Sequence, residues 1–379
     1  MIFDYETLKL IWWLLIGALL IGFAITDGMD MGVGNLLPFL GRTDDERRLM
    51  INTVGPHWDG NQVWLITAGG AIFAAWPAVY ATAFSGFYFA MLLVLFALFF
   101  RPVGFDYRSK LGGERWRKAW DWGLFAGGAI PSLVFGVAFG NLILGVPFYL
   151  DELMRSHYTG SFFALLNPFA LLSGVVSFAM LTLHGGIWLQ MRTSGEISER
   201  VKGFIQWSGL AAMLAFALAG IWLAMGIDGY TITSQPALDS LPNPLVKSVE
   251  VGHAAWLANY GRYPLTMAFP ALGFVGIILT ILLSKANRPG WGFVTSALGI
   301  TGIIMTAGVS LFPFIMPSSS QPGSSLTVWD ATSSHLTLTI MFWAVVLFLP
   351  IVVSYTVWNY RKMWGRLSVD EMRDRFSAY

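Results

Sequence analysis

The fold class is decided by a stretch near the N-terminus, IWWLLIGALLIGFAITDGMD, residues 11–30. A helix needs about 20 mainly apolar residues to span the hydrocarbon layer of a membrane. The stretch therefore predicts a transmembrane helix that carries two acids, Asp27 and Asp30, toward one end. The residues before it include Asp4 and Glu6 but no basic cluster, and no small-residue cleavage pattern follows. We expect a retained first helix and not a signal peptide.

Similar apolar stretches recur along all 379 residues. Only 12% of the residues are charged, against roughly 25% in a soluble domain. The net charge of +1, with no free basic stretch, gives no indication of a nucleic-acid partner. Cysteine is absent, which excludes disulfides, iron–sulfur clusters and thiolate metal sites. The composition predicts an all-α, polytopic protein embedded in a lipid bilayer.

Hydropathy predicts about nine transmembrane helices, with edges uncertain by several residues. They are expected near 9–35, 50–75, 78–100, 122–145, 164–190, 204–226, 263–284, 291–312 and 335–360. The second is the least apolar, because its first half contains the polar run Asn52 to Gln62. A chain of eight helices, with this segment in a loop, is the alternative.

The distribution of basic residues favours nine helices. With nine, all Lys and Arg residues except Lys9, Arg155, Lys247 and Arg262 fall on one side of the membrane. Because basic loops stay in the cytoplasm, we expect a bacterial inner-membrane protein with its N-terminus outside and its C-terminus in the cytoplasm. Aromatic residues at the ends of apolar runs, such as Trp358 and Tyr360, are typical of interfacial belts.

None of the connections is long enough for an independent domain, so residues 1–379 are expected to form a single transmembrane domain. In the fourth expected helix, the pairs Gly123/Gly127 and Gly136/Gly140 predict close approach of a neighbouring helix. No internal repeat is evident, which argues against an inverted-repeat transporter.

Acids inside a membrane span are costly, so they are usually paired, hydrated or functional. Four lie toward the cytoplasmic side: Asp27, Asp30, Asp59 and Asp106. Asp59 is expected about nine residues inside the second helix, whereas Arg101 and Asp106 are expected just after the third. One interpretation is a proton path from the cytoplasm.

Alternatively, Asp27 and Asp30 end the first helix, and Arg101 and Asp106 form an ordinary ion pair. Asp59 is harder to explain in this way, because it lies deeper and has the polar neighbours His57, Asn61 and Gln62 within one helical turn.

Only His57 and His184 among the five histidines lie within expected spans. A haem between facing helices is usually held by histidine or methionine, but the spacing of these two indicates no cofactor, so a shared site is the weaker interpretation. We predict no metal site in this chain. Trp64 is interpreted from the sequence as a packing or anchoring residue.

Several segments together resemble subunit II of the cytochrome bd quinol oxidases. They are Ile11-Trp12-Trp13, Thr26-Asp27-Gly28-Met29-Asp30-Met31-Gly32, Pro56-His57-Trp58-Asp59-Gly60-Asn61-Gln62-Val63-Trp64, Phe100-Arg101-Pro102 and Met316-Pro317-Ser318-Ser319. The resemblance extends to residues 358–366 and to the overall length, so it covers nearly the whole chain.

The resemblance implies a terminal respiratory oxidase that oxidises quinol, reduces O2 to water, and takes the protons from the cytoplasm. In this family the haems, haem b and haem d, belong mainly or wholly to subunit I. No catalytic residue is therefore expected in this chain. The implied partners are subunit I and one or more small single-helix accessory subunits. Members differ in whether subunit II holds a bound ubiquinone.

By motif position, the resemblance assigns Asp59 and Asp106 to a proton pathway, with Asp27 and Asp30 as further members. His57, Trp58 and Arg101 would support them. In some members Trp64 would lie near a lateral oxygen route. Without the resemblance, the leading hypothesis is a proton-coupled secondary transporter, and a purely structural membrane subunit is a third.

Overall fold

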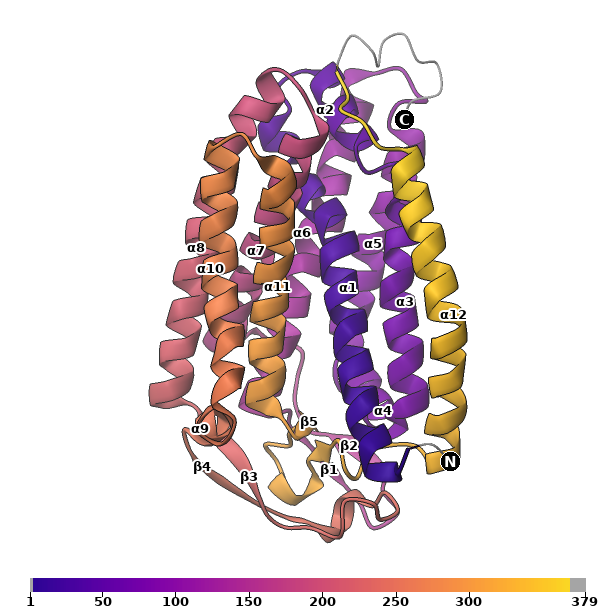
Figure 1. The fold of residues 1–379 in the computed structure, drawn as a ribbon, viewed down its shortest axis with the longest axis vertical. Helices are drawn as coiled ribbons and strands as arrows, with labels where there is room; N and C mark the ends of the chain where they lie inside the picture. Colours follow the sequence, from indigo (N-terminus) through magenta and orange to yellow (C-terminus); the bar gives the residue numbers. More distant parts are fainter. Residues whose placement is uncertain (1–2, 369–379) are drawn as a thin grey trace.

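The structure, a computed structural model, describes residues 3–368. Within them, long helices run side by side along one axis (Figure 1). The helices are α1 Tyr5–Leu40, α2 Asp44–Asn52, α3 Trp58–Ala75, α4 Pro77–Gly86, α5 Tyr88–Tyr107, α6 Glu114–Leu144, α7 Pro168–Arg192, α8 Glu196–Gly226, α9 Ala258–Arg262, α10 Ala268–Lys285, α11 Pro289–Leu311 and α12 His335–Lys362. The predicted helical membrane fold is confirmed.

The described helices fit nine crossings. Eight of them are each long and apolar enough to span a membrane, and α3 with α4 qualifies as a pair bent by 120°. With 18 residues, α3 alone extends about 27 Å, which is close to the thickness of the hydrocarbon layer. Helix α1 begins and α12 ends at opposite ends of the bundle (Figure 1). An odd number of crossings is therefore required, which supports nine over eight.

Two predicted helix boundaries are wrong, and proline accounts for the first. The segment expected at 50–75 begins as a helix only at Trp58, because Pro56 disfavours helical geometry in the residue before it. The segment expected at 78–100 is divided into α4 and α5, and Pro77 occupies the first turn of α4, where proline is tolerated. Helix α5 then continues to Tyr107.

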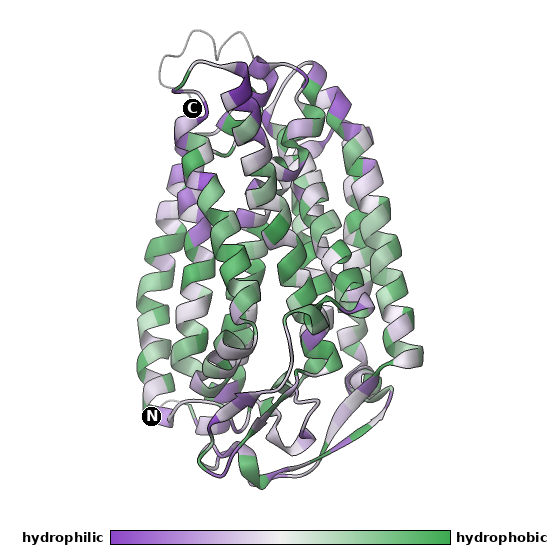
Figure 2. Ribbon diagram, turned by 180° about the vertical axis from the view of Figure 1, so that it is seen from behind, coloured by the Kyte–Doolittle hydropathy of each residue, from purple (hydrophilic) through white to green (hydrophobic). Residues whose placement is uncertain are grey.

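The two ends of the bundle differ. One end, here called the basic end, carries α2 and the α5–α6 and α7–α8 connections; Figure 2 shows hydrophilic residues gathered there and an apolar middle. The opposite end, here called the hairpin end, carries three two-stranded antiparallel sheets. Their strands are β1 Phe148–Leu150, β2 Ser156–Tyr158, β3 Asp228–Ser234, β4 Ser248–His253, β5 Phe314–Met316 and β6 Leu326–Thr327.

Two lysines hold the hairpin end together. The Nζ of Lys9, a fully buried residue on α1, donates to the carbonyl oxygens of Leu238, Ser240 and Trp329 at 2.7–3.1 Å. Lys247 pairs with Asp330 at 2.9 Å. Burial lowers the pKa of Lys247, and the Asp330 carboxylate opposes that shift. Connections far apart in sequence are thereby tied to the start of α1.

Glycines bring the central helices into close contact. A Cβ atom on Gly32 of α1 would meet the carbonyl oxygen of Leu181 and lie 2.8 Å from Gly185 Cα, both on α7. On α6, a Cβ atom on Gly140 would lie 2.6 Å from Ala170 Cα of α7. The close helix approach predicted from the Gly136/Gly140 pair is therefore present, and small residues permit it because the backbones nearly touch.

We predict that Gly32→Ala destabilises the subunit by about 1–3 kcal/mol, because the added methyl group forces α1 and α7 apart. The measurement is the thermal unfolding midpoint of the purified assembly. Gly17→Ala is the matched control on the same helix, since a Cβ atom there meets nothing within 4 Å. Equal midpoints for the two variants would contradict this account of the α1–α7 contact.

Candidate functional site

Two acids and one arginine from different helices meet inside the bundle. Asp27 and Asp30 of α1 and Arg101 of α5 are 0%, 3% and 2% exposed. Arg101 binds Asp27 through two hydrogen bonds, Nη1 to Oδ2 at 2.8 Å and Nη2 to Oδ1 at 2.6 Å. Its Nη2 also lies 3.6 Å from Asp30 Oδ2. If both acids are ionised, the cluster buries one net negative charge, which is strongly disfavoured away from water.

This cluster lies within the length of α1 and not at its end. Helix α1 continues for ten residues beyond Asp30, about 15 Å, to Leu40. The alternative in which Asp27 and Asp30 terminate the first helix is therefore wrong. The alternative ion pair of Arg101 with Asp106 is also wrong, because Arg101 is inside α5 and pairs with Asp27.

Asp30 has one oxygen bound and one free. Asn61 of α3 donates from Nδ2 to Asp30 Oδ2 at 2.9 Å, whereas Asp30 Oδ1 has no partner among the described residues. A cavity of about 10 Å³ adjoins Asp30 and Arg101, between Val33, Phe105 and Leu124. This is about the smallest space that holds one water molecule. Asp30, with its unpartnered oxygen, therefore lines a space of about the size of one water molecule.

The site continues toward the basic end through Asn61. Tyr360 of α12 donates its hydroxyl hydrogen to Asn61 Oδ1 at 2.6 Å. The ring of His57 stacks on the ring of Tyr360 with centroids 4.7 Å apart, and Trp188 of α7 packs edge-on against both rings. A polar chain thus connects α12, α3 and α1.

Of the predicted supporting residues, Trp58 lies against the cluster as expected. Arg101 Cζ lies 6.0 Å from the centre of the Trp58 ring, and that ring also contacts Phe105 with centroids 5.4 Å apart. Trp58 therefore covers the guanidinium on the side that faces the start of α3. His57 does not contact the cluster directly; it stacks on Tyr360, which binds Asn61.

Asp59 and Asp106 lie elsewhere. Both are exposed on the surface of the isolated chain, and neither has a hydrogen bond or ion pair to a residue that the structure describes. Asp59 is the second residue of α3 and not about nine residues inside a helix. Asp106 is in the last turn of α5 and not after it. The two acids therefore lie at the basic end of the bundle, where α3 begins and α5 ends.

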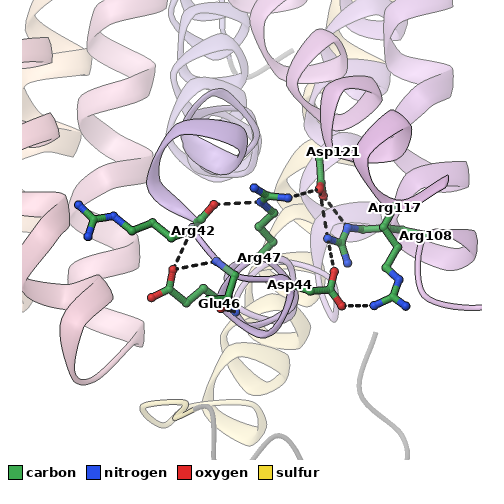
Figure 3. A network of polar contacts seen from close by, with 9 residues as sticks. Arg42, Asp44, Glu46, Arg47, Arg108, Arg117 and Asp121 are labelled. Carbon is green, nitrogen blue, oxygen red and sulfur yellow. Dashed lines mark hydrogen bonds and ion pairs between the residues drawn. The ribbon is translucent and has the colours of Figure 1, made fainter. Parts of the chain in front are cut away.

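A separate ion network fastens this end of the bundle (Figure 3). Asp121 of α6 accepts from Arg108 Nε at 2.5 Å and from Arg47 Nη1 at 3.1 Å. Asp44 of α2 pairs with Arg108 at 2.9 Å and also with Arg117. Helices α2, α5 and α6 are thereby joined just beyond Arg101. Beside them, hydrogen bonds from Arg200 hold the pKa of Glu46 below its usual value.

His57 and His184 are engaged in other contacts. Both ring nitrogens of His184 are hydrogen-bonded, to Ser296 Oγ at 2.7 Å and to the carbonyl oxygen of Ile25 at 2.9 Å. Phe293 stacks on His184 and also contacts Trp188, which packs against His57. The two imidazoles therefore do not share a site. Residues 3–368 contain no group of three His, Cys, Asp or Glu that would hold a metal ion.

Trp64 of α3 packs against the neighbouring helix α1. Its ring is half-buried and faces Gly22 of α1, where a Cβ atom would lie 2.7 Å from Trp64 Cε3. This contact fits the packing interpretation, and the oxygen route stays a prediction.

An apolar cavity of about 220 Å³ lies on the other side of α1, among α6, α7, α8 and α11. Its lining is mostly aliphatic and aromatic, with Phe23, Phe135, Phe139 and Leu223 among its residues. Gly220 of α8 also lines it, and a Cβ atom there would meet nothing within 4 Å.

The sequence did not indicate Tyr360, Arg108 or Asp121 as site residues. Tyr360 was expected in an interfacial belt, and it is instead half-buried and bonded to Asn61. The residues lie 299 positions apart, so only the folded chain brings them together. The one available signal was a tyrosine among basic residues just after an apolar run.

Comparison with known proteins agrees with these features. The sequence profile described as cytochrome bd terminal oxidase subunit II matches residues 8–363. Cytochrome bd-I ubiquinol oxidase subunit 2 of Escherichia coli K12 is 57% identical over 377 residues, which cover 99% of this chain and 100% of that protein. The probable cytochrome oxidase subunit 2 of Haemophilus influenzae is 56% identical, over 99% and 100% of the two chains.

A solved structure shares the fold. A chain of the bd oxidase from Geobacillus thermodenitrificans superposes with a TM-score of 0.67, covering 94% of this chain and 98% of that one, at 14% identity. No comparison supports the alternative of a secondary transporter. On the strength of the full-length profile match and these relatives, the chain belongs to the cytochrome bd terminal oxidase subunit II family.

Proposed function

We propose that this subunit of a bd-type quinol oxidase carries protons for O2 reduction from its basic end toward subunit I, with Asp30 as the group that takes up and releases each proton. The observation that carries the proposal is the charge imbalance at the buried cluster. Asp27 and Arg101 neutralise each other through two hydrogen bonds. Asp30 is the remaining acid, and one of its oxygens is free to hold a proton.

The division of roles between the two acids follows from their contacts. An acid held by a bidentate arginine is stabilised as the anion, so Asp27 serves as the fixed counter-ion of Arg101. Asp30 has only a longer approach to Arg101, at 3.6 Å. When Asp30 is protonated the cluster is neutral, and when it releases the proton the cluster becomes negative and attracts the next one. Arg101 and Trp58 hold this arrangement in place.

The exposed acids Asp59 and Asp106 are proposed as the surface part of the same pathway. An uncompensated carboxylate on a membrane helix is unfavourable when it faces lipid. Both lie beside the region where α3 and α5 approach the buried cluster, as the Trp58–Phe105 contact indicates. Contact with water and with a partner subunit would stabilise the two charged carboxylates.

We propose that subunit I covers the face formed by α3, α5 and α12. Helix α12 buries only Leu338 and α3 only Asn61, Ala68 and Ala75 against the rest of the chain, whereas most of α7 is buried. Large apolar side chains are exposed on all three helices, among them Ile66, Phe99 and Trp343. The haems, b and d, are assigned to subunit I, because His57 and His184 of this chain do not share a site that could hold one. Single-helix accessory subunits are also proposed as partners.

The charge distribution supports the proposed orientation in the bacterial inner membrane. The basic residues of α2 and of the α5–α6 connection lie at the end of the bundle where α12 ends, and basic loops stay in the cytoplasm. Protons would then enter from the cytoplasm. Quinol is the proposed electron donor of the complex.

We predict that Asp30→Asn lowers quinol-dependent O2 consumption by at least about tenfold, because the amide keeps the cluster neutral but cannot release a proton. The haem absorption spectrum of the purified oxidase should be normal, since Asp27 and Arg101 remain paired. Asp27→Asn is the contrasting variant: it removes the counter-ion of a buried arginine and should reduce the amount of assembled oxidase. Normal turnover in Asp30→Asn would refute the proposal.

We predict that Asp59→Asn and Asp106→Asn also lower turnover severely with the haems still assembled. Glu199→Gln is the control, because Glu199 is an exposed acid of the same end and pairs only with Lys202. A packing role would leave turnover near normal in all three variants, and that result would remove the two acids from the pathway.

We further propose that the apolar cavity beside α1 holds the isoprenoid tail of a bound ubiquinone. Its aliphatic and aromatic lining suits a hydrocarbon chain and offers no charged group.

Gly220→Leu should fill part of this cavity without a backbone clash and lower the quinone extracted per haem from the purified complex. Gly203→Leu, also on α8 and open to space but outside the cavity, is the control. Equal quinone contents would exclude the site, and an acyl lipid recovered in its place would assign the cavity to lipid.

A further inference from the structure

The hydrogen bond from Tyr360 to Asn61 fixes the direction of the Asn61 amide. A side-chain amide has a donor end and an acceptor end, and either end can face a given neighbour. Here the Tyr360 hydroxyl donates to Asn61 Oδ1 at 2.6 Å. The opposite end, Nδ2, therefore points at Asp30 Oδ2, at 2.9 Å.

The reverse orientation of the amide would be less favourable. The Tyr360 hydroxyl hydrogen would then lose its acceptor, because Tyr360 Oη has no other hydrogen-bond partner in residues 3–368. A half-buried hydroxyl without an acceptor costs free energy that the bond to Asn61 avoids. The stacked ring of His57 and the edge of Trp188 leave the Tyr360 ring little freedom to turn elsewhere.

The direction of the amide decides which oxygen of Asp30 carries the proton. Oδ2 already accepts from Asn61 Nδ2 and lies 3.6 Å from Arg101 Nη2. A hydrogen on Oδ2 would point at donors, so a protonated Asp30 carries its hydrogen on Oδ1. That oxygen has no protein partner, and Asp30 lines the cavity of about 10 Å³.

We propose that Tyr360 is a positioning residue for proton transfer: through Asn61 it keeps the exchangeable proton of Asp30 on Oδ1, the oxygen from which it can leave. The inference rests on the proposed role of Asp30 as the proton carrier. If the amide turned round, its oxygen would accept the Asp30 hydrogen and retain it. Tyr360 thus prevents Asn61 from trapping the proton that Asp30 must release.

The proposal places a control element on the last helix. Tyr360 is near the end of α12, which packs on the rest of the chain with few buried residues. Other charged and titratable groups lie next to the hydrogen-bonded series of Tyr360, Asn61 and Asp30. They are Asp27 and Arg101 beside Asp30, His57 against Tyr360, and Arg192 over the Trp188 ring. None of them donates to Asn61 Oδ1, so Tyr360 has no substitute in this role.

The test uses the assembled oxidase and the infrared carbonyl band of protonated Asp30, identified by its loss in Asp30→Asn. In the wild type the carbonyl oxygen is Oδ2, which accepts a hydrogen bond from Asn61. In Tyr360→Phe the amide is free to turn. The Asp30 hydrogen is then on Oδ2 and is donated to Asn61, the carbonyl oxygen becomes Oδ1, and the band should move to a different frequency. Turnover should fall by about two- to tenfold, the effect of one neutral hydrogen bond, with a normal haem spectrum.

Two further variants establish that Tyr360 acts through Asn61. Asn61→Leu should also shift the band, and adding Tyr360→Phe to it should cause no further shift, because coupled residues are not additive. Tyr263→Phe is the control, a tyrosine at the hairpin end that is 53% exposed and lies away from the Asp30 cluster; it should change neither the band nor turnover.

The outcomes separate this inference from the proposed function. An Asp30 band that does not move in Tyr360→Phe, or a second shift in the Asn61→Leu background, overturns the positioning role and leaves the role of Asp30 intact. Absence of any Asp30 band also overturns it. Normal turnover in Asp30→Asn overturns the proposed function, whatever the band shows.

Discussion

The bidentate pair of Arg101 and Asp27 is the constraint on which the site depends. A guanidinium that is 2% exposed needs compensation inside the bundle, and Asp27 supplies it from a different helix. This pairing fixes α5 against α1 and leaves Asp30, one turn along α1, as an acid without a full partner. The same bond thus sets the helix packing and creates the unbalanced charge that a proton can neutralise.

The surrounding structure keeps this arrangement in register. Beyond Arg101, the network of Arg108, Asp121 and Asp44 joins α5 to α6 and α2 (Figure 3). Inside the bundle, Gly32 and Gly185 let α1 lie directly on α7. A sideways shift of α1 would therefore break both a backbone contact and a buried ion pair, which makes the position of Asp30 well defined.

The two groups of acids differ in their environment, and this difference gives the proposed proton pathway its direction. Asp59 and Asp106 are exposed at the basic end, whereas Asp27 and Asp30 are enclosed. A surface carboxylate exchanges protons with water readily, but a buried one does so only through ordered neighbours. Asn61 and Tyr360 are such neighbours, and the stacked His57 ring holds Tyr360 in place.

The sequence by itself determined the membrane class, the number of crossings, the family and the identity of the ionisable residues, because apolar length and local motifs are properties of contiguous residues. It also indicated close packing through Gly136 and Gly140. It could not determine which charges pair. Arg101 was a candidate partner for the nearby Asp106, and only the packing of α1 and α5 against α6 brought it to Asp27, 74 positions away. The depth of Asp59 was misjudged because Pro56 delays the start of α3. Tyr360 became part of the site only when α12 returned to the start of α3, since a contact across 299 residues leaves no local pattern.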